Sequence, residues 1–476
     1  MKTTPPSTAP AVGLKSDVIG LLGAATLGMV FLSPAMTLYG LFGPIYIACG
    51  KAAPLSFVLA LFATLPTAFS YAVLSRDFPS AGSTADWAAR ATGPRIGAWA
   101  GWLVFFYYFT NFVIQVVAVG LFFNELMLGL GVTLPVGVGF VVGVLFGCAW
   151  PAWMVYRGLS ISAKGALVFL LIEIATMTAL CVTVVWLAPS RGTPVTFEGF
   201  SPTAALQNTP GLFAALVFAM LGFTGFDVVS TLAEETRTAR KLIPQATIIS
   251  VLLYAVLIVA GTWALTLGGD AAHLKAVAQT ERMPITDVAE HAWGRGSIFI
   301  TLTALTATLA LLIATSVGAS RILFAKGRRL TAPGAFATLH ATYQVPWNAL
   351  HVIFAVGIIA TLAVFALIGA YNAYVWWCTT STFFAMLTFL FGNLAAIILN
   401  RQRLRTPGGF VLYGLVPTLG IACDVYILVQ SFFIELWAQP WATGKSVVVF
   451  DVACALLAAA FIFTRKPQPA ERPGQV

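Results

Sequence analysis

Apolar stretches long enough to cross a lipid bilayer recur along nearly the whole chain, and they constrain its fold more than any other feature. A membrane-spanning helix needs about 20 mainly apolar residues. The sequence predicts twelve such spans, at residues 18–46, 54–75, 97–126, 134–156, 164–188, 210–233, 244–268, 297–323, 348–370, 373–399, 410–436 and 446–464. Only 9% of the residues are charged, whereas soluble domains carry about 25%. The predicted fold class is therefore an all-α integral membrane protein with twelve transmembrane helices.

The positive charges indicate how the chain is oriented. If the amino terminus is cytoplasmic and the loops alternate, 20 of the 26 Lys and Arg residues fall on or just inside the cytoplasmic side. Such an excess marks the cytoplasmic side of a membrane protein. We therefore predict a multi-pass protein of the cell inner membrane with both termini cytoplasmic, on tails 1–16 and 466–476. The net charge of +9 follows from this bias and requires no nucleic acid or other anionic partner.

Two of the spans are interrupted at matching places in the two halves of the chain. The interrupted stretches are residues 24–42 and residues 216–227. The interrupting residues are Gly28, Ser33 and Pro34 in the first stretch and Gly222 and Gly225 in the second. A broken helix frees backbone N–H and C=O groups, and each unpaired group costs several kcal/mol in hydrocarbon. Such breaks survive where they line a cavity, and a pair of them is typical of a transporter's binding site.

The positions of the breaks predict the domain organisation. Each break falls in the first of five spans, so spans one to five and spans six to ten form two units. Because five is an odd number, the second unit runs upside down relative to the first. We predict an inverted-repeat transport core at residues 17–400, followed by two further spans at residues 401–465. Between spans seven and eight, the stretch PITDVAEHAWG predicts a short amphipathic helix over the outer mouth.

Four stretches carry a resemblance to a known family. They are FLSPAMTLYGLFG in the first span, FPSAGSTADWA after the second, FTGFDVVSTLAEETRTARKLIPQA from the sixth into the seventh, and SRILFAKGRRLTAPGAFATLH after the eighth. In this order and spacing the chain resembles the amino acid–polyamine–organocation (APC) superfamily, and it is most similar to the putrescine importer and amino acid permease branch. The resemblance implies a five-plus-five inverted repeat with discontinuous helices 1 and 6, two extra C-terminal helices, and alternating access to a substrate held between the breaks.

The sequence departs from the amino acid permeases of this superfamily at two positions. Those permeases usually have a Gly–Ser/Thr–Gly-like break whose N–H groups hold the substrate carboxylate, whereas this chain has only Gly28 there. Many sodium-independent members have a lysine in the fifth span, where relatives bind sodium, whereas this chain has Glu173. Fewer free N–H groups and an added acid favour an amine-bearing substrate and a proton as the coupling ion.

The candidate substrate-binding residues lie at the two breaks and on the third span. They are Gly28, Met29, Ser33, Gly222, Phe223, Thr224, Gly225, Phe226, Asp227 and Tyr107. A cation over an aromatic face gains about 0.5–2 kcal/mol, which gives Phe223, Phe226 and Tyr107 a means of binding an amine. Packing in the helical core is the alternative role of each of these three aromatic residues.

Three acidic residues lie well inside the predicted spans: Glu173, Asp227 and Asp424. An ionised group at mid-bilayer costs at least about 2.5–3.5 kcal/mol, so each must be neutral, paired or in contact with water. Glu173 and Asp227 are therefore candidate proton-coupling residues, and Asp227 is also a candidate partner for a substrate ammonium. The alternatives are a protonated, hydrogen-bonded Glu173 and an Asp227 that supports the unwound backbone. Asp424 lies outside the ten-helix core and is expected to be structural.

Together these features predict a secondary active transporter that imports a putrescine-like diamine or an amino acid across the lipid bilayer by proton-coupled alternating access. The alternatives are a sodium-coupled amino acid symporter, an amino acid or amine antiporter, and a sensor that binds substrate without transporting it. The four histidines lie in loops or at helix ends, and no metal or cofactor site is predicted. The sequence has no HExxH motif, phosphate-binding glycine loop or nucleophile elbow, so an enzyme is not expected.

Overall fold

The computed structural model describes residues 21–79, 82–135, 137–158, 163–231, 238–328 and 331–464. Helices make up nearly all of this part of the chain, and it contains no β-strand. Ten helical segments within these ranges are long and apolar enough to cross a membrane. The predicted all-α membrane fold class is therefore confirmed at that level. The predicted tails, 1–16 and 466–476, lie outside the described residues.

The first half of the chain contains one interrupted helix followed by four long ones. Its elements are α1 (Leu21–Leu32), α2 (Pro34–Met36), η1 (Thr37–Leu41), α3 (Phe42–Cys49), α4 (Ala53–Asp77), α5 (Ser83–Thr92), α6 (Pro94–Gly129), α7 (Val138–Tyr156) and α8 (Ala163–Leu187). The run from α1 to α4 is one nearly continuous helical stretch of 57 residues, more than twice the roughly 20 residues that cross a bilayer.

The second half also begins with an interrupted helix. Its elements are α9 (Pro202–Gln207), α10 (Thr209–Gly222), α11 (Val228–Thr231), α12 (Ala239–Leu265), α13 (Ala271–Gln279), α14 (Pro284–Trp293), α15 (Ile298–Arg328), α16 (Trp347–Ile368), α17 (Ala370–Leu399), α18 (Pro407–Phe410), α19 (Val416–Ile427), η10 (Leu428–Leu436) and α20 (Ser446–Thr464). A short 3-10 turn, η3 (Pro189–Arg191), follows α8 and precedes this half.

Several helices extend beyond the spans that hydropathy predicts. The clearest case is α6, which has 36 residues, whereas the apolar pattern gives 97–126. At 1.5 Å per residue α6 is about 54 Å long, and the hydrocarbon core of a bilayer is about 30 Å thick. Hydropathy detects the lipid-embedded part of a helix, so its ends in the polar zone are missed.

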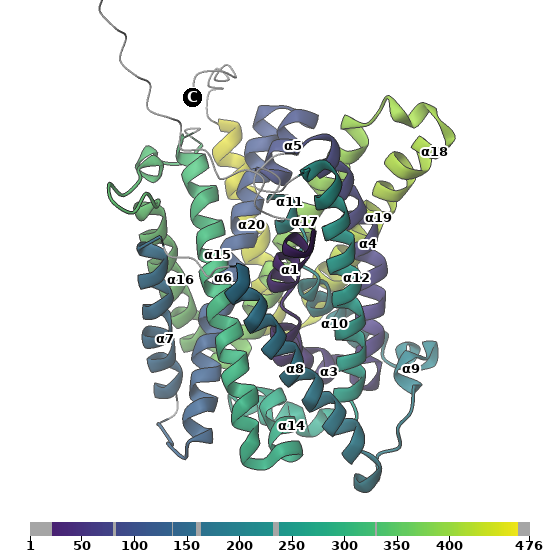
Figure 1. The fold of residues 1–476 in the computed structure, drawn as a ribbon, viewed down its shortest axis with the longest axis vertical. Coiled ribbons are helices and arrows are strands. Elements are labelled where there is room, and N and C mark those ends of the chain that lie inside the picture. The colour runs from purple at the N-terminus through teal and green to yellow at the C-terminus, as the bar shows by residue number, and fades with distance from the viewer. Residues whose placement is uncertain are drawn as a thin grey trace, which may run out of the picture.

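The helices differ in how much of their surface is buried. Most of α6 and α17 is buried inside the bundle, whereas α8, α16 and α19 turn much of their surface outwards. Trp186 on α8 is 82% exposed and Leu367 on α16 is 81% exposed. Such apolar surface is unsuited to water and suited to lipid. Figure 1 shows α7 and α16 along one edge of the bundle, with α1 and α10 near its centre.

The two ends of the bundle carry different short helices. Figure 1 shows α3, α9 and α14 at one end and α5, α11 and α18 at the other. The first is named the α14 end below, and the charge distribution predicts that it faces outwards from the cell. Helix α14 is the short amphipathic helix that the sequence predicts. It packs against α3, where a methyl group on Gly43 would lie only 2.6 Å from the Pro284 ring.

Candidate functional site

The first break in the helices lies at Ser33, between α1 and α2. Ser33 has a φ of 42°, a left-handed conformation that is uncommon for serine. Pro34 explains the break, because a proline disfavours the helical conformation of the preceding residue and has no N–H to donate. A wide π-helical turn, η1, then leads into α3. Gly28 and Met29 lie inside α1, so the chain leaves the helix at Ser33 and not at Gly28.

The second break runs from Phe223 to Asp227, between α10 and α11. Here Gly225 has a φ of 109°, which an L side chain rarely adopts. The N–H groups of Phe223 and Thr224 bond the carbonyls three residues earlier, so α10 ends in a tightened turn. The hydroxyl of Thr224 also donates to the carbonyl of Leu221, at 2.7 Å.

The two breaks are in direct contact through their main chains. A methyl group placed on Gly225 would lie 2.8 Å from the carbonyl oxygen of Phe31, the second-last residue of α1. No real side chain tolerates so close a contact with a backbone oxygen. Glycine at this position is therefore required both by the backbone conformation and by the proximity of the other broken helix.

The carboxylate of Asp227 is bonded within the second break. Its Oδ1 atom accepts hydrogen bonds from the N–H of Gly225, at 3.1 Å, and from the hydroxyl of Tyr107 on α6, at 3.2 Å. Asp227 is buried and does not line the cavity described below. Its described contacts therefore correspond to the second of its two predicted roles, support of the unwound backbone.

A cavity lies beside the two breaks. About 70 Å³ of it is open to the centre of a water molecule, and one water needs about 10–15 Å³ by this measure. It therefore has room for several waters or for one small solute. The polar side chains of its lining are Ser33, Thr37, Tyr107, Tyr108, Asn111, Gln115, Thr224, Thr315 and Tyr374. Among the described residues, no charged side chain lines the cavity.

A row of polar side chains on α6 faces this cavity. Tyr107, Asn111 and Gln115 are spaced four residues apart, so they lie on one face of the helix. The side-chain oxygen of Gln115 is buried, and in the described part of the chain it has no hydrogen-bond donor. Tyr107 is among the binding residues predicted from the sequence, whereas Asn111 and Gln115 are not. The signal was present, because polar residues at this spacing are unusual in an otherwise apolar membrane helix.

The predicted aromatic residues Phe223 and Phe226 do not line the cavity. Both are fully buried. The ring of Phe223 lies 5.1 Å from that of Tyr254, and the ring of Phe226 lies 5.1 Å from that of Phe389. These are the contacts of core packing, which was the alternative role of both residues. The aromatic residues that line the cavity are instead Phe31 of α1 and tyrosines of α6 and α17, including Tyr374.

Glu173 lies apart from the cavity, on α8. Its side chain is buried, and α8 packs against α1, α2, α12 and α15. Glu173 therefore lies on a helix that contacts both parts of the interrupted first helix, and it does not line the cavity.

Two further buried acids lie outside the ten-helix part of the fold. Asp424 on α19 contacts the amide nitrogen of Asn393, at 3.3 Å, and the hydroxyl of Thr67, at 3.5 Å. Asp451 on α20 is also fully buried and lies near Thr380. Asp424 is one of the acids predicted from the sequence, whereas Asp451 is not, although it lies in the last predicted span.

Charged residues fasten the α14 end to the bundle. Arg282, just before α14, pairs with Glu125 of α6 at 2.9 Å and with Glu290 of α14 at 2.6 Å. Glu125 also accepts the N–H of Met283, at 2.9 Å. Burial opposes the charge on Arg282, but its hydrogen bonds to Glu290 and Glu125 outweigh burial and raise its pKa. This group of residues, the Arg282 cluster, holds the start of α14 against α6.

A bundle of membrane helices with two interrupted members meeting beside a central cavity defines the class of a polytopic membrane permease. The sequence profile of the family described as amino acid permease matches residues 23–466. The chain belongs to that family, and its predicted place in the APC superfamily is confirmed.

Individual relatives cover both substrate classes that the sequence suggests. The chain is 28% identical over 410 residues to the low-affinity putrescine importer PlaP of Escherichia coli (strain K12), covering 84% of this chain and 85% of the relative. It is 25% identical over 318 residues to the branched-chain amino acid permease BcaP of Bacillus subtilis (strain 168), covering 64% and 65%. It is 26% identical over 262 residues to the L-methionine/branched-chain amino acid exporter YjeH of Escherichia coli (strain K12), covering 51% and 54%.

Proposed function

We propose that this chain is a secondary active transporter of the cell inner membrane. It moves a small amine-bearing substrate, either a putrescine-like diamine or an amino acid, by alternating access. The observation that carries the proposal is the contact of Gly225 with Phe31 beside a cavity whose lining includes three tyrosines. Broken membrane helices that meet at mid-depth are the usual site of substrate binding in such carriers.

The proposal includes twelve transmembrane helices arranged as an inverted repeat of five and five plus two, with both termini cytoplasmic. The run Leu21–Asp77 is long enough to cross twice, and α10 with α11 supplies a further, interrupted crossing. These two additions bring the ten long apolar segments to twelve. The excess of Lys and Arg on one side supports the orientation.

The lining of the cavity supports an ammonium group as the main feature of the substrate. The carbonyl end of α1, at Phe31 and Leu32, borders the cavity, and the C-terminal end of a helix carries partial negative charge. The next segment begins with Pro34, which has no N–H to offer a carboxylate. Gln115 adds an acceptor oxygen without a donor among the described residues. We therefore place a diamine ahead of an amino acid as the preferred substrate.

Counterflow in proteoliposomes tests this proposal. Purified protein is reconstituted with unlabelled putrescine or leucine inside, and entry of the labelled compound is measured. We expect putrescine counterflow that saturates, with weaker or no counterflow of leucine. Absence of counterflow with every amine and amino acid tested would remove the transport proposal, and binding without counterflow would favour the sensor.

Gln115→Leu tests the assigned cavity. Loss of the amide oxygen removes one hydrogen bond to the substrate, which is worth about 1.5–3 kcal/mol when the partner is charged. We expect the KM for putrescine to rise by about tenfold or more, since 1.4 kcal/mol corresponds to a factor of ten. Gln207→Leu, on the exposed helix α9, is the matched control and should leave the KM unchanged. Equal effects of the two variants would contradict the assignment.

Glu173 is the residue that we propose for proton coupling. It is buried on the helix that packs against both parts of the first break, so its protonation can act on that break. Glu173→Gln fixes the neutral form, and we expect it to abolish uptake driven by a pH gradient while leaving exchange partly intact. The side chain of Glu198 is 64% exposed, so the control variant Glu198→Gln should change neither gradient-driven uptake nor exchange. Unchanged pH dependence in Glu173→Gln, or uptake that requires a sodium gradient, would contradict the proton role.

A further inference from the structure

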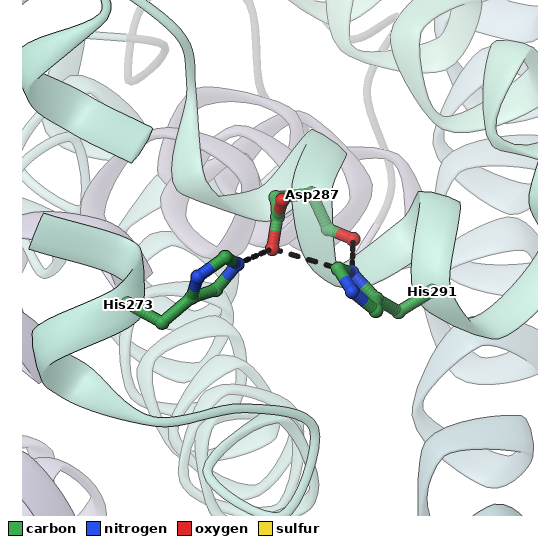
Figure 2. A group of neighbouring side chains, drawn as sticks. All are labelled: His273, Asp287 and His291. Atoms are coloured by element: carbon green, nitrogen blue, oxygen red, sulfur yellow. Dashed lines mark hydrogen bonds and ion pairs between the residues drawn. The ribbon is translucent and has the colours of Figure 1, made fainter. Parts of the chain in front are cut away.

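Three side chains that can bind a metal gather at the α14 end, away from the cavity. His273 lies on α13, and Asp287 and His291 lie on α14 (Figure 2). The Nε2 atom of His273 is 3.0 Å from Oδ2 of Asp287, and Nδ1 of His291 is 3.4 Å from the same oxygen. The spacing of these residues along the chain matches no metal-binding motif, so sequence analysis predicted no metal site. The fold brings them together.

The separations of the three side chains suit a tetrahedral metal ion. Zinc binds imidazole nitrogen and carboxylate oxygen at about 2.0–2.2 Å, which places neighbouring donor atoms about 3.3 Å apart. The two measured separations lie on either side of this value, and all three donor atoms lie within 4.8 Å of one another. Figure 2 shows the two rings turned towards one carboxylate from opposite sides.

The donors and their exposure indicate which metal would bind. Two imidazoles and one carboxylate form a donor set that suits zinc and related transition metals, whereas magnesium and calcium prefer oxygen ligands. The side chains of His273 and His291 are 52% and 57% exposed, and that of Asp287 is 11% exposed. The ion could therefore enter from solvent and keep a water as its fourth ligand.

A purely structural role explains only part of this arrangement. Asp287 lies in the first turn of α14, where a negative charge stabilises the helix. Nδ1 of His291 also lies 2.9 Å from the backbone carbonyl of Asp287, a contact that metal binding would replace. Neither role requires a second histidine, from a different helix, to contact the same carboxylate oxygen.

We propose that His273, Asp287 and His291 form a zinc site that clamps α13 to α14. Both helices pack against α3, the continuation of the first broken helix. Trp293 at the end of α14 donates to Thr183 of α8, at 3.1 Å, so α14 is tied to that helix as well. A bound ion would hold α13 and α14 together against α3 and inhibit transport, and this second part rests on the proposed function.

Zinc binding to the purified full-length protein tests the site independently of transport. The protein is stripped of metal in detergent and titrated with zinc alone by isothermal calorimetry. We expect one zinc per chain, and no heat from magnesium under the same conditions. His273→Ala and His291→Ala should each weaken binding by more than the roughly 10–100-fold that loss of an outer-shell partner costs, and the double variant should not bind.

The other two histidines supply a matched control. His340 and His351 lie beside Trp347, at the start of α16, and their double replacement by alanine should leave zinc affinity unchanged. Retention of zinc binding by the His273/His291 double variant, or no binding by the unaltered protein, would overturn the site.

The clamp is tested by adding zinc during putrescine counterflow. We expect inhibition of the unaltered protein and none of the His273/His291 double variant. Zinc that binds without inhibiting counterflow would overturn the proposed clamp but would still support the proposed metal site. A protein without counterflow would count against the proposed function only, because the calorimetric result does not depend on it.

Discussion

The two helix breaks are constructed by different means. At the first, Ser33 takes a left-handed conformation without glycine's freedom, and Pro34 forces the interruption by removing a donor. At the second, Gly225 supplies the positive φ, and the carboxylate of Asp227 accepts hydrogen bonds from the N–H of Gly225 and from the hydroxyl of Tyr107. The second break is thus fixed by the carboxylate of its own acid, whereas at the first break the backbone N–H and carbonyl of Ser33 are both bonded to neighbouring helical turns. Ser33 lines the cavity and Asp227 does not, so we expect Asp227 to act mainly as a scaffold and Ser33 to contribute more to substrate binding.

Gly225→Ala should have the largest effect on this arrangement. Its backbone conformation would cost alanine about 1–3 kcal/mol, and the methyl group would press on the Phe31 carbonyl at 2.8 Å. We expect a lower thermal transition of the purified protein and loss of counterflow.

Gly192→Ala separates the effect of the backbone conformation from the effect of the contact with Phe31. Gly192 also has a positive φ, of 73°, but no atom lies within 4 Å of an added methyl group. It should lose stability from the backbone alone and keep its counterflow. If Gly225→Ala also keeps its counterflow, close contact between the two breaks is not required for transport.

Asp227→Asn should have the next largest effect. An amide in place of the carboxylate weakens two hydrogen bonds to a charged acceptor, each worth about 1.5–3 kcal/mol. As a scaffold residue, Asp227 should affect all substrates alike, so we expect equal fractional losses of counterflow for putrescine and for leucine or another neutral amino acid. A loss confined to putrescine would instead show direct contact with the substrate ammonium.

Tyr107→Phe is the companion variant for Asp227. It removes one of the two donors to Asp227 and keeps the aromatic ring in the cavity. We expect a smaller loss of stability than in Asp227→Asn, measured by the same thermal transition. A larger loss would place the main support of the break on α6.

Ser33→Gly should have the smallest effect on stability. Glycine relieves the left-handed strain but adds about 0.5–1 kcal/mol of backbone entropy to the unfolded chain, so the two changes nearly cancel. Ser33 lines the cavity, and its hydroxyl makes no helix-capping hydrogen bond. We therefore expect an unchanged thermal transition with a raised KM for putrescine. A marked rise in stability with an unchanged KM would mean that Ser33 is strained without a role in binding.

The sequence predicted the membrane class and the second break because both depend on local chemistry. Long apolar runs indicate spans, and glycines followed by an acid indicate an interruption, whatever the tertiary packing. The first break was placed less well, since Gly28 proved compatible with a regular helix and Pro34 was the decisive residue.

The lining of the cavity was harder to predict because it depends on which way each helix face turns. Phe223 and Phe226 lie at the break, yet both rings pack into the core. Asn111 and Gln115 lie far from either break in sequence, and only the packing of α6 brings them to the cavity. The grouping of His273 with His291 likewise depends on how two short helices pack.

The Arg282 cluster has a consequence for the resting state of the protein. The side chain of Glu125 is only 2% exposed, and a buried charge deprived of its partner costs about 3–5 kcal/mol. A conformation in which α14 moves away from α6 must therefore keep Arg282 paired with Glu125 or admit water to both charged groups. Salt screens exposed charges far more than buried ones, so bulk ionic strength should barely weaken the contact between Arg282 and Glu125.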